Sequence, residues 1–289
     1  MAADPETGGR AGATDRILRY TKWVALIIIP FLVVAWVLLY LLPGDTEQLF
    51  AWTIMPPLTA MFLASAYLGG IVFFINVLRP NTWHRVRHGF PAVLVFATLL
   101  SIATFLHWDR FHPGHISFIV WVTLYVVTPF LVLAVLILNR GQDPGVPDER
   151  DYALPLVVRV VLAVIGLCAL VAGLFLFFSP QQTIAVWAWL LTPLTARVAG
   201  AVLTLPGVVN VWMLWDARWS AFRWVFQAQL ASLVFIVAAL GLRRDDLLWE
   251  RPSAALFVGG MIFSLVAYAG FYIWCDARAR ALAPRAAPL

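Results

Sequence analysis

The residues best suited to chemistry in this sequence are its five histidines, three of which stand within nine positions. His107, His112 and His115 are accompanied by Asp109, and such a set of imidazole and carboxylate groups could close on a divalent metal. The spacing matches no zinc signature, and no histidine lies midway along an apolar run, where two could hold a haem between helices. The alternative interpretation is a set of histidines in an exposed loop at the membrane surface.

Two similar triplets, Trp108-Asp109-Arg110 and Trp249-Glu250-Arg251, are the next candidates for a ligand-binding role. An indole at the membrane interface anchors a helix end, and neighbouring acids and bases can pair or bind a polar ligand. Because the triplets occur in different halves of the chain, we expect reciprocal ion pairs, Asp109 with Arg251 and Glu250 with Arg110. The alternative is that both triplets only cap helices and anchor them at the interface.

Arg197 is the one strong base inside an apolar run, four residues after Pro193. A guanidinium near the end of a membrane helix can grip a phosphate or carboxylate in a bidentate manner, so Arg197 is a candidate ligand-binding residue. It can equally extend its charge to the lipid headgroups. A third interpretation is an ion pair with a nearby acid, for which the sequence offers Asp245, Asp246 and Glu250.

Sequence signatures of common enzymes are missing. The chain has no Walker loop, dinucleotide fingerprint, local Ser-His-Asp motif or HExxH sequence. Cys168 and Cys275 are isolated within or at the end of apolar runs, so they predict neither a disulfide framework nor a zinc site. The sequence therefore requires no cofactor and favours a protein without its own catalytic site, although it leaves enzymatic activity open.

The elements that must position these residues are membrane-spanning helices. Of the 289 residues, 62% are hydrophobic and only 12% are charged, which is too little charge to cover a soluble protein of this size. Runs of about 20 apolar residues are long enough to cross a bilayer as helices. The sequence predicts an all-α integral membrane protein with eight such spans, at residues 23–42, 57–78, 90–107, 117–139, 156–178, 193–215, 224–242 and 254–274.

The distribution of Lys and Arg predicts the orientation. Fifteen of them lie on the side of the two termini and four on the other side. Cytoplasmic loops carry an excess of positive charge, so we expect a multi-pass protein of the inner membrane with both termini in the cytoplasm. Residues 1–20 and 279–289 would form cytoplasmic tails. The net charge of +5 is explained in this way, and membrane lipid rather than nucleic acid is the expected partner.

An internal duplication is predicted from matches between the two halves. Pro57-Leu58-Thr59-Ala60 recurs 136 residues later as Pro193-Leu194-Thr195-Ala196, and the two Trp-acid-Arg triplets match at an offset of 141. Residues 21–140 and 156–278 would form two four-helix repeats, joined by a flexible cytoplasmic linker at 141–155. Because four is an even number of spans, the repeats would be parallel and related by a pseudo-two-fold axis along the membrane normal.

These observations favour a non-catalytic membrane protein that binds a lipid or small amphipathic ligand, or that serves as the membrane subunit of a larger complex. One alternative is a transporter with its substrate between the two repeats. Another is a redox or metal-binding subunit that uses the loop from His107 to His115.

Overall fold

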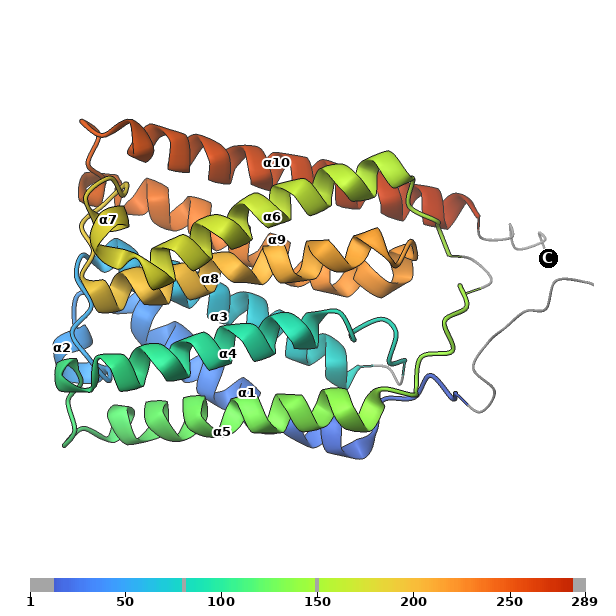
Figure 1. Cartoon of the computed structure of the whole chain (residues 1–289), viewed down its shortest axis with the longest axis horizontal. Coiled ribbons are helices and arrows are strands. Elements are labelled where there is room, and N and C mark those ends of the chain that lie inside the picture. The colour runs from blue at the N-terminus through green and yellow to red at the C-terminus, as the bar shows by residue number, and fades with distance from the viewer. Residues whose placement is uncertain (1–12, 80–81, 149–150, 283–289) are drawn as a thin grey trace, which may run out of the picture.

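The computed structural model describes residues 13–79, 82–148 and 151–282, and the elements in these ranges are helices. Eight of the helices are long and apolar enough to cross a membrane, which confirms the predicted number of spans and fits a multi-pass membrane protein. Figure 1 shows them side by side along one direction. They are α1 (Arg19–Trp36, continued by a π-helical turn at Val37–Leu41), α3 (Pro57–Leu78), α4 (Gly89–Leu106), α5 (Ile116–Asn139), α6 (Leu156–Phe178), α8 (Pro193–Val211), α9 (Trp219–Leu242) and α10 (Pro252–Ala281).

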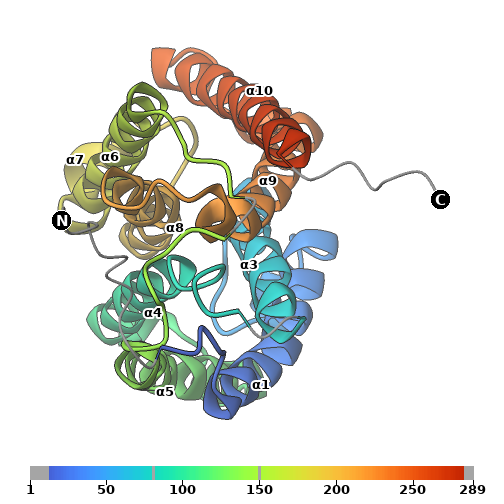
Figure 2. The same ribbon diagram turned by 90° about the vertical axis from the view of Figure 1, so that its right-hand side faces the viewer.

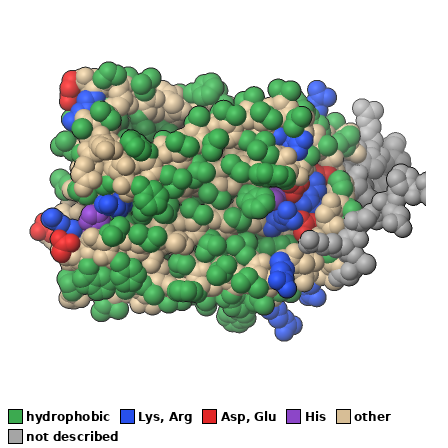
Figure 3. Space-filling view, in the orientation of Figure 1, with side chains coloured by type: hydrophobic (Ala, Val, Ile, Leu, Met, Phe, Trp, Pro, Cys, Tyr) green, Lys and Arg blue, Asp and Glu red, His purple; other side chains and the backbone are tan. Residues whose placement is uncertain are grey.

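The bundle has two different ends. We call the end at which α1 begins and α10 ends the tail end, and the other the opposite end (Figure 1). The loops from α3 to α4, α5 to α6 and α8 to α9 lie at the tail end. Two short helices, α2 (Thr46–Leu49) and α7 (Pro180–Ile184), lie at the opposite end. Figure 3 shows hydrophobic side chains over the middle of one face and charged side chains gathered at the two ends, as a bilayer requires.

The start of α8 follows from its sequence. Thr192 accepts a hydrogen bond from the Thr195 N–H while the Thr195 hydroxyl bonds back to the Thr192 N–H, and Pro193 occupies the first helical position. This arrangement satisfies backbone donors that a helix start leaves free. The preceding residues form the separate helix α7, so α8 has a length that fits the bilayer core.

Helices α3 and α8 form the centre of the bundle (Figure 2). In their most apolar stretches 78% and 72% of the residues are buried, against 11% in α10 at the periphery. Helix α3 packs against α1 and α9, and α8 packs against α6 and α4; the outer pairs are α4 with α5 and α9 with α10. The contacts of α1 with α3 and of α4 with α5 in the first half thus resemble those of α6 with α8 and of α9 with α10 in the second.

The closest helix contact, between α6 and α8, depends on glycine. A Cβ atom on Gly200 would lie 2.5 Å from the Gly173 carbonyl oxygen, and one on Gly207 would lie 2.5 Å from the Gly166 carbonyl oxygen. Any side chain at these positions would push the backbones apart. Small residues are the usual means of bringing membrane helices together, because they let the backbones approach and increase van der Waals contact.

Backbone hydrogen bonds in the loops also occur in matched pairs. At the opposite end, the His112 N–H donates to Ala51 and the Leu248 N–H donates to Ala188, both at 2.9 Å. At the tail end, the Trp83 N–H donates to Asp15 at 2.9 Å and the Trp219 N–H donates to Tyr152 at 3.0 Å. Corresponding residues stand 136 or 137 positions apart.

Two short 3-10 turns stand at the same offset, at Trp108–Arg110 and at Arg244–Asp246. The predicted match between the two Trp-acid-Arg triplets has a different offset, of 141 positions.

Candidate functional site

The predicted ligand residue Arg197 lies against the predicted metal ligand His107. The Arg197 Nη1 atom donates to His107 Nε2 at 2.7 Å, which joins α8 to the end of α4. Burial lowers the pKa of His107, and the neighbouring Arg197 cation lowers it further. The imidazole is therefore neutral at pH 7, and its Nε2 lone pair is engaged by Arg197.

The other two histidines of the predicted metal site have separate roles. His115 caps α5, because its Nδ1 accepts from the Ser117 N–H at 3.3 Å, while His112 Nε2 lies 3.4 Å from the Thr53 hydroxyl. Among residues 13–79, 82–148 and 151–282, no group of three or more His, Cys, Asp or Glu side chains is arranged to hold a metal. With His107 facing a cation, the geometry gives this metal site no support.

The expected reciprocal ion pairs between the triplets are wrong. Arg110 pairs with its neighbour Asp109 at 3.1 Å, and both side chains are mostly exposed. Arg251 instead donates to the carbonyl oxygens of Ile184 and Trp187, at 3.1 and 3.0 Å. Ile184 is the last residue of α7 and Trp187 lies in the turn that follows, so Arg251 accounts for one carbonyl of the helix terminus and one of the turn. Trp249 donates to the Arg244 carbonyl at 2.9 Å, and Glu250 belongs to the same loop.

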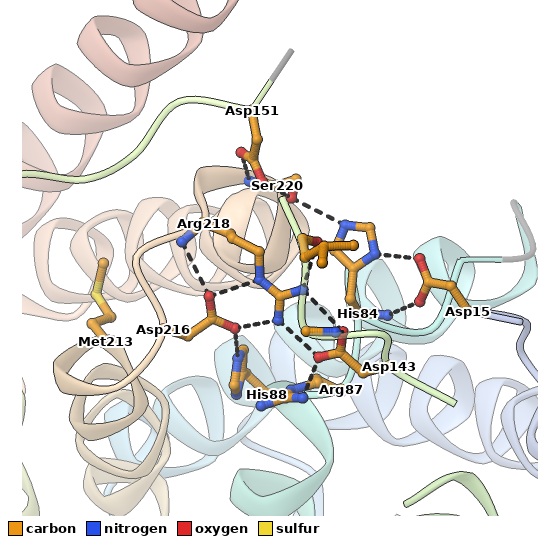
Figure 4. A network of polar contacts seen from close by, with 12 residues as sticks. Asp15, His84, Arg87, His88, Asp143, Asp151, Met213, Asp216, Arg218 and Ser220 are labelled. Atoms are coloured by element: carbon orange, nitrogen blue, oxygen red, sulfur yellow. Dashed lines mark hydrogen bonds and ion pairs between the residues drawn. The ribbon is translucent and has the colours of Figure 1, made fainter. Parts of the chain in front are cut away.

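The tail end contains a buried cluster of charged residues centred on Arg218 (Figure 4). The Arg218 guanidinium donates to both carboxylate oxygens of Asp143, at 2.9 and 2.7 Å, and to both of Asp216, at 2.9 and 2.7 Å. His88 Nε2 lies 2.8 Å from Asp216, and Arg87 pairs with Asp143. We call these five residues the Arg218 cluster. It ties the loop before α4, the linker after α5 and the loop before α9 together.

The protonation of the Arg218 cluster follows from burial and hydrogen bonding. Burial alone would raise the pKa of each carboxyl group, but the bonds from Arg218 outweigh it. They lower the pKa of Asp143 to about 2, and together with His88 they hold the pKa of Asp216 well below its usual range. The two carboxylates in turn raise the pKa of Arg218. Burial lowers the pKa of His88, whose ring stacks on Phe222.

A second polar structure lies beside this cluster and crosses between the two halves (Figure 4). Asp15 Oδ2 lies 2.5 Å from His84 Nδ1, and Asp15 Oδ1 accepts the His84 backbone N–H at 2.8 Å. His84 Nε2 lies 3.0 Å from the Ser220 hydroxyl. The Ser220 hydroxyl lies 2.5 Å from Asp151 Oδ2, and its backbone N–H donates to Asp151 Oδ1 at 2.9 Å. We call these four residues the His84 chain.

The His84 chain was missed by the sequence analysis, which found no local Ser-His-Asp motif. Its members come from the segment before α1, the loop before α4, the linker and the first turn of α9. The spacing of these residues in the sequence therefore does not predict that they lie together. The one available signal was the repeat: Asp15 matches Asp151, and His84 matches Ser220, both at an offset of 136.

A pocket of about 500 Å³ opens next to Ser220 at the tail end. Three arginines and three aspartates share its wall with two tryptophans, and we call it the tail-end pocket. Its lining residues are Arg85, Asp148, Asp151, Trp219, Ser220, Arg223, Trp224, Asp276, Ala279 and Arg280. Arg85 pairs with Asp148 at 2.8 Å and Arg223 with Asp276 at 2.7 Å. His84 itself is 1% exposed and lies behind Ser220.

A second pocket, of about 210 Å³, lies inside the bundle and is lined by residues of all eight long helices. We call it the central pocket. Its wall is almost entirely apolar, and none of its lining residues is charged. On the side of the first half, Tyr67, Phe96 and Tyr125 fill space, and the two tyrosine hydroxyls bond to each other at 2.8 Å. The positions 136 residues later are the smaller or more flexible Leu203, Ser232 and Met261.

Gln229 is a polar residue of the central pocket whose side chain has no partner. Both atoms of its side-chain amide are buried, and neither has a hydrogen bond within the described residues. A buried polar group without a partner loses about 1–3 kcal/mol of solvation. At the offset of 136 used for the predicted repeat, the corresponding position holds Val93.

Comparison of the sequence with protein-family models found no match, and comparisons with curated proteins and with solved structures found none either.

Proposed function

We propose that this chain is a membrane protein that binds a small, uncharged amphipathic molecule in the central pocket. The observation that carries the proposal is the Gln229 amide, which is buried in an apolar wall with both its donor and its acceptor unused. Binding sites of this kind are mostly apolar, with a few polar groups that orient the ligand. An occupant with a hydroxyl, carbonyl or amide group would satisfy Gln229 and bury its apolar part among the helices.

The two-repeat arrangement belongs to the same proposal. The matched helix pairings and the matched loop hydrogen bonds support two parallel four-helix repeats about a pseudo-two-fold axis. In such a frame the pocket would have two equivalent sides. One side is filled by Tyr67, Phe96 and Tyr125, whereas the other has smaller side chains and Gln229. A single asymmetric ligand would favour such a difference, in which one side of the pocket is filled and the other carries a polar group.

The charge of the occupant follows from what surrounds it. An ion in an apolar wall without a counter-charge costs far more than a neutral polar group. The absence of charged lining residues therefore favours a neutral headgroup or a neutral small molecule over an anionic lipid. Arg197, predicted to grip an anionic group, lies near the opposite end and is engaged by His107, so its role in ligand binding remains a separate prediction.

The experiment compares two phenylalanine substitutions on α10. Ser264 lines the central pocket, whereas Val266 is 67% exposed on the outer face of the same helix. We expect Ser264→Phe to reduce the neutral lipid or small molecule retained in native mass spectrometry of the purified protein, and Val266→Phe to leave it unchanged. Gln229→Leu should also reduce retention, because the new side chain cannot hydrogen-bond. Equal ligand retention in all four proteins would contradict the proposal.

The orientation is tested separately by cysteine labelling in intact cells. The excess of Lys and Arg on the tail side favours a cytoplasmic location for that end, so a cysteine at Asp148 should be labelled only after the cells are opened. A cysteine at Gln181, in α7, should be labelled from outside. The reverse pattern would overturn the proposed location of the termini.

A further inference from the structure

We propose that Ser220 is a nucleophilic serine, with His84 as its base and Asp15 as the positioning residue, and that it accepts acyl groups from ester or thioester substrates in the tail-end pocket. This activity is separate from ligand binding in the central pocket. It rests on groups brought together from three distant segments at the tail end.

The distances are those of an activated nucleophile. The Ser220 hydroxyl and His84 Nε2 are 3.0 Å apart, and His84 Nδ1 and Asp15 Oδ2 are 2.5 Å apart. A nucleophile within hydrogen-bond reach of a base, with the base oriented by a third group, is the geometric criterion for this chemistry on any fold. In the proposed mechanism Asp15 accepts a hydrogen bond from His84 Nδ1–H, so Nε2 is the nitrogen that faces the serine and accepts its proton.

Asp15 is itself held in place. Its second carboxylate oxygen accepts the backbone N–H of His84 at 2.8 Å, so one carboxylate fixes both the imidazole and the loop that carries it. Asp148 Oδ2 also faces His84 Nε2, at 3.6 Å, and is held there by Arg85. These carboxylates stabilise the imidazolium that forms when His84 takes the serine proton.

The tail-end pocket gives a substrate access to Ser220. Ser220 lines the tail-end pocket, while His84 is buried behind it and does not contribute to the wall. A substrate entering the pocket would therefore meet the hydroxyl first. Arg85 and Arg223 line the same pocket, each paired with an aspartate, and are the nearest candidates to stabilise a carbonyl oxygen that becomes negative during attack.

The proposed acyl transfer has two stages, acylation of Ser220 and hydrolysis of the acyl-serine. The Ser220 oxygen forms a bond to the carbonyl carbon, and its proton passes to His84 Nε2. The carbon–oxygen or carbon–sulfur bond of the substrate then breaks, and His84 returns the proton to the departing alcohol or thiol. Water attacks the acyl-serine by the same path, which releases a carboxylic acid and restores Ser220.

Asp151 competes with His84 for the serine proton. Its Oδ2 atom lies 2.5 Å from the Ser220 hydroxyl, so the hydroxyl has two acceptors and can donate to only one at a time. When the hydroxyl points to Asp151, it is not aligned with the base. Asp151 therefore restrains the nucleophile, and Asp151→Asn is expected to increase reactivity, whereas loss of His84 or Asp15 is expected to reduce it strongly.

The experiment uses a fluorophosphonate probe on the full-length purified protein in detergent. Attack by Ser220 forms an oxygen–phosphorus bond, expels fluoride and passes the proton to His84. We expect peptide mass spectrometry to locate the label on Ser220. Ser220→Ala should abolish labelling, and His84→Gln should slow it about 100-fold or more, which is typical of a lost general base.

Asp15→Asn provides the readout that a purely structural role would not change. The amide oxygen can still accept the His84 backbone N–H, so the melting temperature should be close to that of the native protein. The labelling rate should nevertheless fall as far as in His84→Gln, because the amide cannot fix the same tautomer. Ser253→Ala, in the first turn of α10 at the opposite end, is the matched serine control and should label normally.

Three results would overturn the proposal: no label on Ser220 of the folded native protein, equal labelling of heat-denatured protein, or normal labelling of a folded Asp15→Asn variant. Hydrolysis of p-nitrophenyl butyrate, measured on the same proteins, should follow the order of the labelling rates. Loss of ligand from the central pocket in Ser264→Phe should leave labelling unchanged, so the two proposals fail or succeed independently.

Discussion

The two ends of the bundle are held together by different forces. At the tail end, buried charges of the Arg218 cluster join three loops through hydrogen bonds of 2.7–2.9 Å. At the opposite end, aromatic rings pack against one another. The ring centroids of Trp52 and Trp121 are 4.7 Å apart, and those of Trp189 and Phe257 are 5.1 Å apart. The contrast shows that the chain concentrates its buried polar groups, and hence its capacity for chemistry, at the tail end.

The difference also concerns tolerance of change. A buried ion that loses its partner remains in a medium that solvates it poorly, so a single substitution in the Arg218 cluster disrupts several groups at once. Substitution of one aromatic residue removes only the contact area that its ring buries and any hydrogen bond that the ring makes. The following experiments measure this contrast, from the largest expected effect to the smallest.

Arg218→Met should have the largest effect on stability. It leaves Asp143 and Asp216 buried without the guanidinium that both share, and breaking a buried ion pair in this way costs about 3–5 kcal/mol. The measurement is the unfolding of the purified protein in detergent. Arg110→Met is the matched control, because that side chain is 71% exposed and pairs only with Asp109. A native melting temperature in Arg218→Met would remove the distinction between the two ends.

Trp189→Phe should have an intermediate effect. The Trp189 indole N–H donates to the Thr59 hydroxyl at 2.9 Å, and this bond joins the loop after α7 to the first turn of α3. Phenylalanine keeps most of the aromatic contact but loses the hydrogen bond, so we expect a loss of about 1–3 kcal/mol in unfolding free energy. Trp108→Phe, at an exposed position of the same end, should change little.

Acid should weaken the tail end selectively. The pKa of Asp143 is lowered to about 2 in the folded protein, and that of Asp216 is lowered as well. A lowered folded-state pKa gives stability that is present above the unfolded value and lost as the carboxyl groups protonate. We therefore expect the melting temperature to fall between about pH 4 and pH 2. The fall should be smaller in Arg218→Met, and an equal fall in both proteins would contradict the assignment.

The smallest expected effect is on His107 at the opposite end. Arg197→Met removes a cation that lowers the pKa of this histidine, so the pKa should rise toward its usual value while burial still holds it down. NMR titration of the imidazole measures the shift. Arg197→Lys should leave the pKa low, because a charge remains nearby. If Arg197 also grips an anionic lipid, both variants should lose that lipid in native mass spectrometry, with Met losing more.

Most of the fold was predictable because its signals are local. A run of apolar residues of the right length is enough to predict a membrane helix. The start of α8 is likewise predicted by a short segment, since Thr192 caps the helix and Pro193 is its first residue. The duplication of the two halves stays a prediction from the sequence, with matches at offsets of 136 and 141.

The candidate sites were much less predictable. The sequence directed attention to Arg197 and the histidines of the opposite end, since these stand close together or interrupt apolar runs. The structure does join Arg197 to His107, but Arg218, Asp143 and Ser220 gave no local signal. Apart from Asp216, two positions from Arg218, their side-chain partners lie 56 or more positions away, in separate loops that only the packing of eight helices brings together.

The segment from α5 to α6 also affects the order in which the tail end can assemble during synthesis. Asp143 on this segment precedes its partner Arg218 by 75 positions, and Leu154 on the same segment bonds to Ala217. During synthesis α1 to α8 are made before Arg218 exists, and until then Asp143 has only Arg87 of the Arg218 cluster as a cationic partner. The three loops of the tail end can therefore be joined through Arg218 only when the start of α9 has been made.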